Sequence, residues 1–221
     1  QAGGVCGLNV TLPFKEEASQ LCDHVSDRAE IAAAVNTLCF REEGDIYGDN
    51  TDGVGLVIDV EENLGLRLRG RRLLILGAGG AARGVLQPLL EAGPKQLVIA
   101  NRTPEKARQL AVAFAGYGPV EAVGLDHLSG CHFDLVVNAT SASLSGETPP
   151  LPDALFAANA LAYDMMYGDE PTVFMQWAKD HGAEQVSDGL GMLVEQAAAS
   201  FYLWNEIKPQ TVEVIRLVRE M

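Results

Sequence analysis

The segment Leu73–Gly84, LLILGAGGAARG, decides the predicted fold of the whole chain. An apolar strand runs into a glycine-rich turn, and a helical pattern follows directly. Gly77 permits the tight turn, Gly79 lets the backbone approach a pyrophosphate, and the helix N-terminus supplies free N–H groups and a positive dipole. A second apolar strand ends about 20 residues further on, which is the context that the dinucleotide-binding fingerprint requires. We therefore predict a dinucleotide site here rather than a purely structural turn.

Downstream of this segment, strand and helix patterns alternate. Strands are predicted at 73–76, 96–100, 120–123, 133–138, 161–164 and 185–186, and helices begin at Ala81 and Pro104. Strands that are apolar on both faces and alternate with helices are typical of a parallel sheet covered by helices. The pattern predicts an α/β protein with a Rossmann-type dinucleotide-binding domain over residues 67–187.

Upstream, a shorter α/β pattern predicts a second unit. Strands are expected at 5–10, 37–41 and 46–48, and helices at 15–25, 27–34 and 52–63. The basic stretch 67–72 then links this unit, residues 1–66, to the dinucleotide-binding domain. Two amphipathic helices, 190–207 and 211–221, are too long for the tail of a nucleotide domain. We therefore expect residues 188–221 to pack back on the first unit.

Composition excludes several classes of partner. The formal net charge of −14 in 221 residues argues against nucleic acid, because such binding is usually driven by clustered Lys and Arg. No apolar run predicts a membrane span. The four cysteines are scattered without a C-x-x-C pair, which predicts neither a zinc site nor a disulfide framework and suits a reducing cytoplasm. The four histidines lack ligand-like spacing, so we expect no metal site.

After the second strand, the sequence VIANRTPEK lacks the acidic residue that usually binds the ribose 2′-hydroxyl of NAD. Neutral Asn101 is followed by Arg102 and Thr103, with Lys106 about one turn later. Because Arg pairs strongly with phosphate, these residues favour NADP, whose ribose carries a 2′-phosphate. Thr103 and Pro104 also fit a simple helix cap, and capping leaves the Arg102 guanidinium available.

Two further motifs suggest proton-transfer chemistry. In the stretch GLNVTLPFKEEA, a stiff, apolar segment precedes Lys15, which stands at the start of a predicted helix. The stretch YGDNTDG places Asp49, Asn50 and Asp52 between a strand and a helix. The second motif alone fits an Asx turn with a helix cap equally well. Redox chemistry at a secondary alcohol needs a group that donates or accepts a proton while hydride moves, and a Lys beside an Asp can do this. Lys15 and Asp52 are therefore the candidate pair, although the sequence does not show whether they meet.

Six segments together resemble one enzyme family: GLNVTLPFK, AVNT, GDNTDG, GAGGAARG, NRT and DGLGMLVEQA. Each segment alone is weak evidence, but six in order over nearly the whole chain are specific. The chain resembles the shikimate dehydrogenases, NADP-dependent oxidoreductases that act on a CH–OH group. The resemblance implies a substrate domain and a Rossmann-type NADP domain that flank a cleft, and the reversible reduction of 3-dehydroshikimate to shikimate.

The resemblance also implies roles for individual residues. Lys15 would be the catalytic lysine, with Asp52 as its partner at the substrate hydroxyls. The residues implied in binding the polyol are Asn9, Thr11, Asn36, Tyr167 and Gln196, although a lone buried Gln is usually only a hydrogen-bonded core residue. The residues implied in cofactor binding are Gly77, Gly79, Gly80 and Ala81 at the pyrophosphate, Asn101, Arg102, Thr103 and Lys106 at the adenosine phosphate, and Met165, Gly189 and Met192 near the nicotinamide.

The chain departs from the family at two places. Lys106 stands where many members carry a second Arg, which keeps the charge but loses bidentate geometry. The family's N-terminal strand and helix, with a Ser-x-Ser-Pro segment that holds the substrate carboxylate, have no counterpart. We expect the chain to be shorter by about 50 residues, a length near one and a half βαβ units. We also expect its α/β substrate domain to be incomplete and its activity to be impaired.

Such a gap would expose strand edges and apolar side chains, which favour a homodimer or other self-association. Small-molecule substrates are the expected partners, without nucleic acid or membrane. Two alternatives to the main functional hypothesis stay open. One is a quinate/shikimate dehydrogenase that uses NAD, and the other is an NADP-binding module without catalysis.

Overall fold

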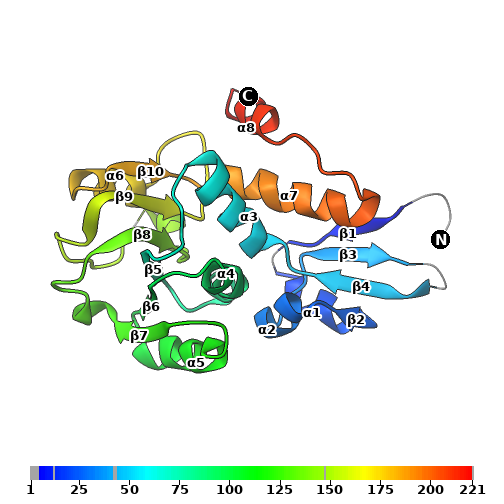
Figure 1. The fold of residues 1–221 in the computed structure, drawn as a ribbon, viewed down its shortest axis with the longest axis horizontal. Coiled ribbons are helices and arrows are strands. Elements are labelled where there is room, and N and C mark those ends of the chain that lie inside the picture. Colours follow the sequence, from blue (N-terminus) through cyan, green and yellow to red (C-terminus); the bar gives the residue numbers. More distant parts are fainter. Residues whose placement is uncertain (1–4, 12, 42–43, 147, 221) are drawn as a thin grey trace.

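The structure, a computed structural model, describes residues 5–11, 13–41, 44–146 and 148–220. Two sheets lie at opposite ends of the molecule, and helices α3 and α7 run between them (Figure 1). Within the described ranges, no helix has the length and apolar character needed to cross a membrane.

The larger sheet has six parallel strands among the described residues, in the order β10-β9-β8-β5-β6-β7. Its strands are β5 (Arg72–Leu76), β6 (Gln96–Asn101), β7 (Val120–Gly124), β8 (Phe133–Asn138), β9 (Phe156–Asp164) and β10 (Gln185–Ser187). The strand order changes direction between β5 and β8, and open α/β sheets bind ligands at such a switch point. The predicted α/β fold with a Rossmann-type parallel sheet is confirmed.

Both faces of this sheet are buried, as the uninterrupted apolar strands predict. Leu73 and Ile75 of β5 pack into a core that also contains residues of α4 (Gly80–Glu91) and α5 (Pro104–Phe114). Leu74 and Leu76 face the other side, where the core includes Phe174 of α6 (Val173–Asp180). Successive side chains of one strand therefore stabilise two separate layers of helices.

The smaller sheet contains four described strands in the order β1-β3-β4-β2. These are β1 (Gly7–Asn9), β2 (His24–Val25), β3 (Thr37–Phe40) and β4 (Ile46–Asp49). β3 pairs antiparallel with β1 and β4, whereas β2 pairs parallel with β4. Helices α1 (Lys15–Gln20) and α2 (Asp27–Ala32) pack against this sheet through buried Ala18 and Ala29.

The predicted helix 15–25 is wrong in its second half. Helix α1 ends at Gln20, and His24 and Val25 form strand β2 instead. The Asp23 carboxylate accepts the N–H of Ile46 at 2.8 Å, and His24 lies opposite Tyr47 in the ladder. The partners of this strand lie more than 20 residues downstream, so local helix periodicity could not reveal it.

Helix α3 (Asp52–Ile58) continues as a π-helical turn, η2 (Asp59–Asn63), and packs beside α7 (Leu190–Asn205). Glycines allow this close approach: a Cβ on Gly55 would lie 2.7 Å from the backbone nitrogen of Gln196. At the far end of α7, the indole N–H of Trp204 donates to the carbonyl of Leu38 in β3 at 2.9 Å. Helix α7 therefore ties the nucleotide-binding sheet to the smaller sheet, and α8 (Val212–Arg219) follows it.

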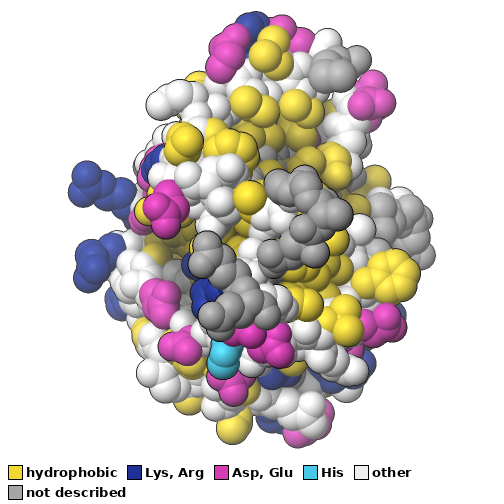
Figure 2. Space-filling view, turned by 90° about the vertical axis from the view of Figure 1, so that its right-hand side faces the viewer, with side chains coloured by type: hydrophobic (Ala, Val, Ile, Leu, Met, Phe, Trp, Pro, Cys, Tyr) yellow, Lys and Arg dark blue, Asp and Glu magenta, His cyan; other side chains and the backbone are white. Residues whose placement is uncertain are grey.

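Hydrophobic side chains gather on the end of the molecule that carries the smaller sheet (Figure 2). Exposed residues in this region include Leu8 of β1 and Phe201 and Tyr202 of α7, with exposed fractions of 52%, 41% and 53%. Helix α8 also carries exposed apolar side chains: Val212, Val214, Leu217 and Val218.

Candidate active site

The two candidate proton-transfer residues meet in the structure. Lys15 is the first residue of α1 and Asp52 the first residue of α3, and the Lys15 Nζ donates to the Asp52 Oδ2 at 2.6 Å. Both side chains are about one-fifth exposed, so a ligand can reach them while the protein holds their positions. Asn50 contributes the Asx turn expected from the sequence, because its Oδ1 accepts the backbone N–H of Asp52 at 3.1 Å. The motif GDNTDG therefore contains both the Asx turn and the carboxylate that contacts Lys15.

Buried amides extend this pair into a polar cluster. The Nδ2 of Asn36 lies 2.8 Å from the Asp52 Oδ1 and 3.2 Å from the Gln196 Oε1, where it donates to both oxygens. Asn36 is 2% exposed, and its own Oδ1 accepts the backbone N–H of Thr51. Asp52 is thus oriented by Lys15 on one oxygen and by Asn36 on the other. Gln196 is a member of the cluster rather than an isolated core residue.

Three buried hydroxyls complete the cluster, and sequence reasoning missed them. Thr37 and Ser200 lie 2.7 Å apart, Thr51 lies 3.2 Å from Ser200, and Asn9 donates to the Ser200 oxygen at 2.9 Å. Ser200 stands one helical turn after Gln196, so the i, i+4 spacing on α7 was the available signal. Thr11, by contrast, is exposed and contributes a backbone carbonyl to the N–H of Phe14.

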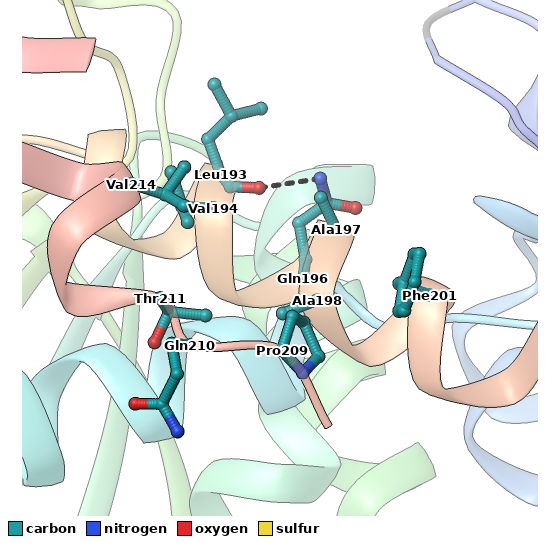
Figure 3. A pocket seen from close by; sticks show the side chains of 10 residues that line it. All are labelled: Leu193, Val194, Gln196, Ala197, Ala198, Phe201, Pro209, Gln210, Thr211 and Val214. Carbon is teal, nitrogen blue, oxygen red and sulfur yellow. Dashed lines mark hydrogen bonds between the residues drawn. The ribbon is translucent and has the colours of Figure 1, made fainter. Parts of the chain in front are cut away.

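The pocket nearest to Gln196 on the outer side of α7 is a mostly apolar groove of about 360 Å³ (Figure 3). Its described lining is Leu193, Val194, Gln196, Ala197, Ala198, Phe201, Pro209, Gln210, Thr211 and Val214. Gln196 turns its Nε2 toward the carbonyl of Leu193 at 2.8 Å, while its Oε1 serves Asn36. The lining carries no charged side chain among the described residues, so this groove does not suit a dinucleotide's phosphates.

The glycine-rich turn has the geometry that a pyrophosphate requires. Gly77 adopts a φ of +105°, and a Cβ there would lie 3.1 Å from the carbonyl oxygen of Ala139, so a larger residue would be strained. Gly79 and Gly80 open α4, and a Cβ on either would meet no described atom within 4 Å. Gly79, Gly80 and Ala81 are exposed, and no side chain caps the helix N-terminus. This space and these free N–H groups fit a pyrophosphate.

The second cofactor motif presents cations at the end of β6. Asn101 donates from Nδ2 to the carbonyl of Thr103 at 2.9 Å, which folds the turn before α5. Thr103 occupies the N-cap position, but its side chain makes no capping hydrogen bond. Arg102 and Lys106 are exposed, and neither forms a salt bridge with a residue in the described ranges. These donors suit a ribose phosphate.

The residues expected near the nicotinamide lie just after β9 and at the start of α7. Met165 and Gly189 lie together, because a Cβ on Gly189 would overlap the Met165 carbonyl, and Met192 is 8% exposed in the first turn of α7. Tyr167, which was expected instead to line the substrate cleft, is 50% exposed in the loop after β9. The expectation that Tyr167 lines the substrate cleft therefore stays a prediction.

A buried carboxylate that sequence reasoning overlooked organises this loop. Asp164 is fully buried and accepts hydrogen bonds from Asn138 at 3.2 Å, Ser143 at 2.6 Å and Thr172 at 2.7 Å. It also accepts the N–H of Met166 at 3.1 Å. The loops after β8 and β9 are thereby joined at the carboxyl edge of the sheet. The stretch VNATSAS, residues 137–143, spans the end of β8 and supplies two of the donors, Asn138 and Ser143.

The two parts of the site lie close together. A Cβ on Gly84 of α4 would lie 3.8 Å from the Asp52 Oδ2, so the helix that begins at the glycine-rich turn also flanks the Lys15–Asp52 pair. A parallel-sheet dinucleotide site beside a positioned Lys–Asp pair defines a class: the two-unit, dinucleotide-dependent oxidoreductases.

Comparison with known proteins agrees with this class of oxidoreductases and identifies one family within it. Three family models match: the shikimate dehydrogenase substrate binding domain over residues 1–38, shikimate / quinate 5-dehydrogenase over 59–145, and the shikimate 5′-dehydrogenase C-terminal domain over 189–219. The chain belongs to the shikimate dehydrogenase family.

Individual relatives extend over nearly the whole chain. The shikimate dehydrogenase (NADP(+)) of Cellvibrio japonicus is 57% identical over 218 residues, which are 99% of this chain and 79% of the relative. A crystal structure of an Ael1 enzyme from Pseudomonas putida superposes with a TM-score of 0.88 at 47% identity, over 97% of this chain and 78% of that one. The Thermus thermophilus shikimate 5-dehydrogenase in complex with NADP(H) and shikimate has a TM-score of 0.83 at 36% identity, over 98% and 79% of the two chains.

Proposed function

We propose that this chain catalyses the reversible, NADP-dependent reduction of 3-dehydroshikimate to shikimate. The observation that carries the proposal is the 2.6 Å contact between Lys15 and Asp52 beside the helix that starts at the glycine-rich turn. The names of the curated relatives, which are NADP(+) shikimate dehydrogenases at 49–57% identity, support the same substrate and cofactor.

The chain's own residues account for proton transfer. NADPH, when bound, supplies the hydride for the carbonyl carbon. Lys15 gives a proton to the carbonyl oxygen as that oxygen gains negative charge, and takes it back in the reverse direction. Asp52 holds the Lys15 ammonium and accepts a hydrogen bond from a neighbouring substrate hydroxyl, while Asn36 fixes the second Asp52 oxygen. The positioned pair saves the entropy of bringing a proton donor to the substrate.

We propose roles for the remaining residues from the family resemblance. Substrate hydroxyls would be bound by Asn9, Thr11, Asn36, Tyr167 and Gln196. The pyrophosphate would be bound by Gly77, Gly79, Gly80 and Ala81, the 2′-phosphate by Asn101, Arg102, Thr103 and Lys106, and the nicotinamide by Met165, Gly189 and Met192. Support comes from the exposed helix N-terminus and the exposed cations. We also propose 1–66, 67–187 and 188–221 as the substrate-binding, NADP-binding and C-terminal units.

Catalysis by Lys15 is tested in the reverse direction, by shikimate-dependent formation of NADPH. Lys15→Ala removes a positioned proton-transfer group, so we expect kcat to fall about 10²–10⁴-fold while the NADP dissociation constant is unchanged. Lys95→Ala, at an exposed turn before β6, is the control and should keep wild-type turnover. Equal turnover by the Lys15→Ala variant would contradict the proposal.

The same assay separates the two alternatives. A quinate/shikimate dehydrogenase that uses NAD would turn over faster with NAD than with NADP at one substrate concentration. A non-catalytic module would bind NADP in calorimetry but show no shikimate-dependent NADPH formation. Turnover should be measured at high enzyme concentration, so that slow shikimate oxidation is also detected.

We also propose that the apolar surface around α7 and β1 supports self-association of the chain. The groove of Figure 3 is lined by apolar and uncharged side chains, which include the 41% exposed Phe201. Tyr202 of α7 and Leu8 of β1 are also more than half exposed. Contiguous exposed apolar surface of this kind is typical of association sites. A second copy of the chain is the proposed partner. The cytoplasmic location expected from the cysteines stays a prediction.

A further inference from the structure

A buried tyrosine joins three elements close to the candidate site. Tyr163 of β9 is fully buried, and its hydroxyl donates to the Asp59 Oδ2 at 2.6 Å. The same hydroxyl oxygen accepts the backbone N–H of Met192 at 3.3 Å. Tyr163 therefore contacts η2 and the first turn of α7 at once.

The Asp59 carboxylate is held on its other side as well. The Asn63 Nδ2 lies 2.9 Å from the Asp59 Oδ1 and 3.0 Å from the Glu195 Oε1, so it donates to two carboxylates. Asp59 and Glu195 are each 3% exposed. A Cβ on Gly191 would overlap the Asp59 carboxylate, so only glycine lets the carboxylate approach the α7 backbone this closely. The π-helical turn thus supplies side chains that hold the start of α7.

Helix α7 carries this constraint toward the reacting groups. Met192 and Gln196 are one turn apart, and both pack on Gly55 of α3. Gln196 accepts from Asn36, which in turn donates to Asp52. A shift in the first turn of α7 would therefore move Met192 relative to Asp52. Farther along α7, Ser200 and Trp204 are held separately by Thr37 and Leu38.

We propose that Tyr163 is a positioning residue: through its bonds to Asp59 and Met192, it fixes the first turn of α7 relative to the Lys15–Asp52 pair. The inference rests on the proposed function, in which Met192 lies beside the nicotinamide. Tyr163 does not touch the substrate. It sets the geometry between the side of the site that places the cofactor and the side that transfers the proton.

The kinetic test is Tyr163→Phe, which removes one hydroxyl and keeps the ring. Because small misplacements of reacting groups lower rates steeply, we expect kcat to fall about tenfold to hundredfold. The shikimate KM and the NADP dissociation constant should stay within about threefold, since Ser200 and Trp204 still hold the other end of α7. The matched control is Tyr202→Phe on α7, which removes a hydroxyl from a ring that is 53% exposed. This variant should keep wild-type kcat.

Amide hydrogen exchange gives a readout that does not depend on turnover. The Met192 N–H loses its acceptor in Tyr163→Phe, so exchange across residues 189–194 should accelerate, while residues 198–204 keep wild-type protection. Unchanged exchange at 189–194 would overturn the inference. Faster exchange with wild-type kcat would overturn it too, because the tyrosine would then be structural only.

A second variant keeps the test independent of the stability of Tyr163→Phe. Asp59→Asn retains an oxygen that can accept from Tyr163, so its loss of kcat should be smaller than that of Tyr163→Phe. In the double variant the two losses should not multiply, because both changes act on the same hydrogen bond between Tyr163 and Asp59. Multiplying losses would overturn the inference. The wild-type chain could instead show no turnover while Tyr163→Phe still exchanges faster at residues 189–194. That result would reject the proposed function, but it would still support the role of Tyr163 in holding the first turn of α7.

Discussion

At the scale of single residues, charge and hydrogen bonding decide what each part of the site can hold. Lys15 and Asp52 form a partly exposed ion pair whose carboxylate is also bound by buried Asn36. Arg102 and Lys106 instead present exposed charges, with no described carboxylate paired to either. The first arrangement keeps a proton donor in place, and the second leaves cations available for an anionic ligand.

Cofactor preference follows from Arg102. The 2′-phosphate of NADP forms charge-assisted hydrogen bonds with a guanidinium, so Arg102→Ala should weaken NADP binding by about 1.5–3 kcal/mol and leave NAD nearly unaffected. Calorimetric titration with both cofactors measures the difference. Arg108→Ala is the control, since Arg108 already pairs with Glu105 at 3.2 Å. Equal losses for the two cofactors would show that Arg102 is structural.

Asp59 makes stability depend on pH in a direction unusual for a carboxyl group. Burial raises the pKa of Asp59 above its ordinary value of 3.8, although hydrogen bonds from Tyr163 and Asn63 act the other way. The folded state therefore holds this proton to a higher pH than the unfolded chain. The stability contribution of Asp59 falls as pH rises from 3.8 through the raised pKa.

Asp59→Asn removes this titration, so the variant should gain stability relative to wild type as pH rises through that window. Denaturant unfolding at several pH values measures the trend. Asp126→Asn should show the opposite trend at lower pH: because the hydrogen bond with His127 lowers the pKa of the Asp126 carboxyl below 3.8, this variant should lose stability relative to wild type as pH rises toward 3.8. A difference between Asp59→Asn and wild type that does not vary with pH would refute the prediction.

At the scale of elements, glycines on α3 and α7 set how closely the two helices pack. Gly55 faces the α7 backbone, and neither partner can retreat without moving Gln196 or Asp52. Side chains at i and i+4 on α7 then reach different parts of the cluster: Gln196 contacts Asn36, and Ser200 contacts Thr37. The interface of α3 with α7 therefore determines the shape of the site as well as stability.

Gly55→Ala tests this close approach. Its Cβ would lie 2.7 Å from the Gln196 nitrogen and 2.8 Å from the Met192 carbonyl oxygen, so both helices would have to separate. We expect the free energy of unfolding to fall by about 1–3 kcal/mol, as for other overpacked cores. Gly116→Ala is the matched control, because a Cβ there meets no described atom within 4 Å. Chemical denaturation of both variants gives the comparison, and equal stabilities would contradict the packing argument.

At the scale of the whole molecule, α7 connects the two sheets, and the exposed apolar surface offers a site for self-association. Helix α7 begins beside the nucleotide-binding sheet and ends against β3, so motions of the two ends are coupled through one element (Figure 1). The outer face of α7 meets the groove of Figure 3 and the exposed side chains of Figure 2. Self-association through this face would also bury a wall of the site.

Self-association should therefore depend on Phe201. Replacing this groove-lining residue with Asp places a charge in an apolar contact, so Phe201→Asp should shift light scattering toward a smaller mass at equal concentration. Val112→Asp is the control, because Val112 is 79% exposed on α5 outside this surface. A wild-type chain that is monomeric at every concentration would contradict the prediction.

Features that depend on neighbouring residues were accessible from the sequence. The glycine-rich turn, the alternation of apolar strands with helices, the Asx turn at Asn50 and the Pro104 helix start all agree with the structure. Each follows from backbone preferences or from side-chain periodicity within a few residues. The sequence therefore determined the fold class, the position of the glycine-rich turn and the cations after β6.

Only the tertiary structure decided which distant residues meet. Lys15 and Asp52 are 37 residues apart, Thr37 and Ser200 are 163 apart, and Asp59 and Tyr163 are 104 apart. Strand β2 likewise exists because β4 supplies its ladder partners. These contacts depend on how helices and sheets pack, and that packing rests on glycine positions and buried hydrogen bonds rather than on local periodicity. The sequence thus supplied the reactive groups, and the packing of α3 against α7 gave them one geometry.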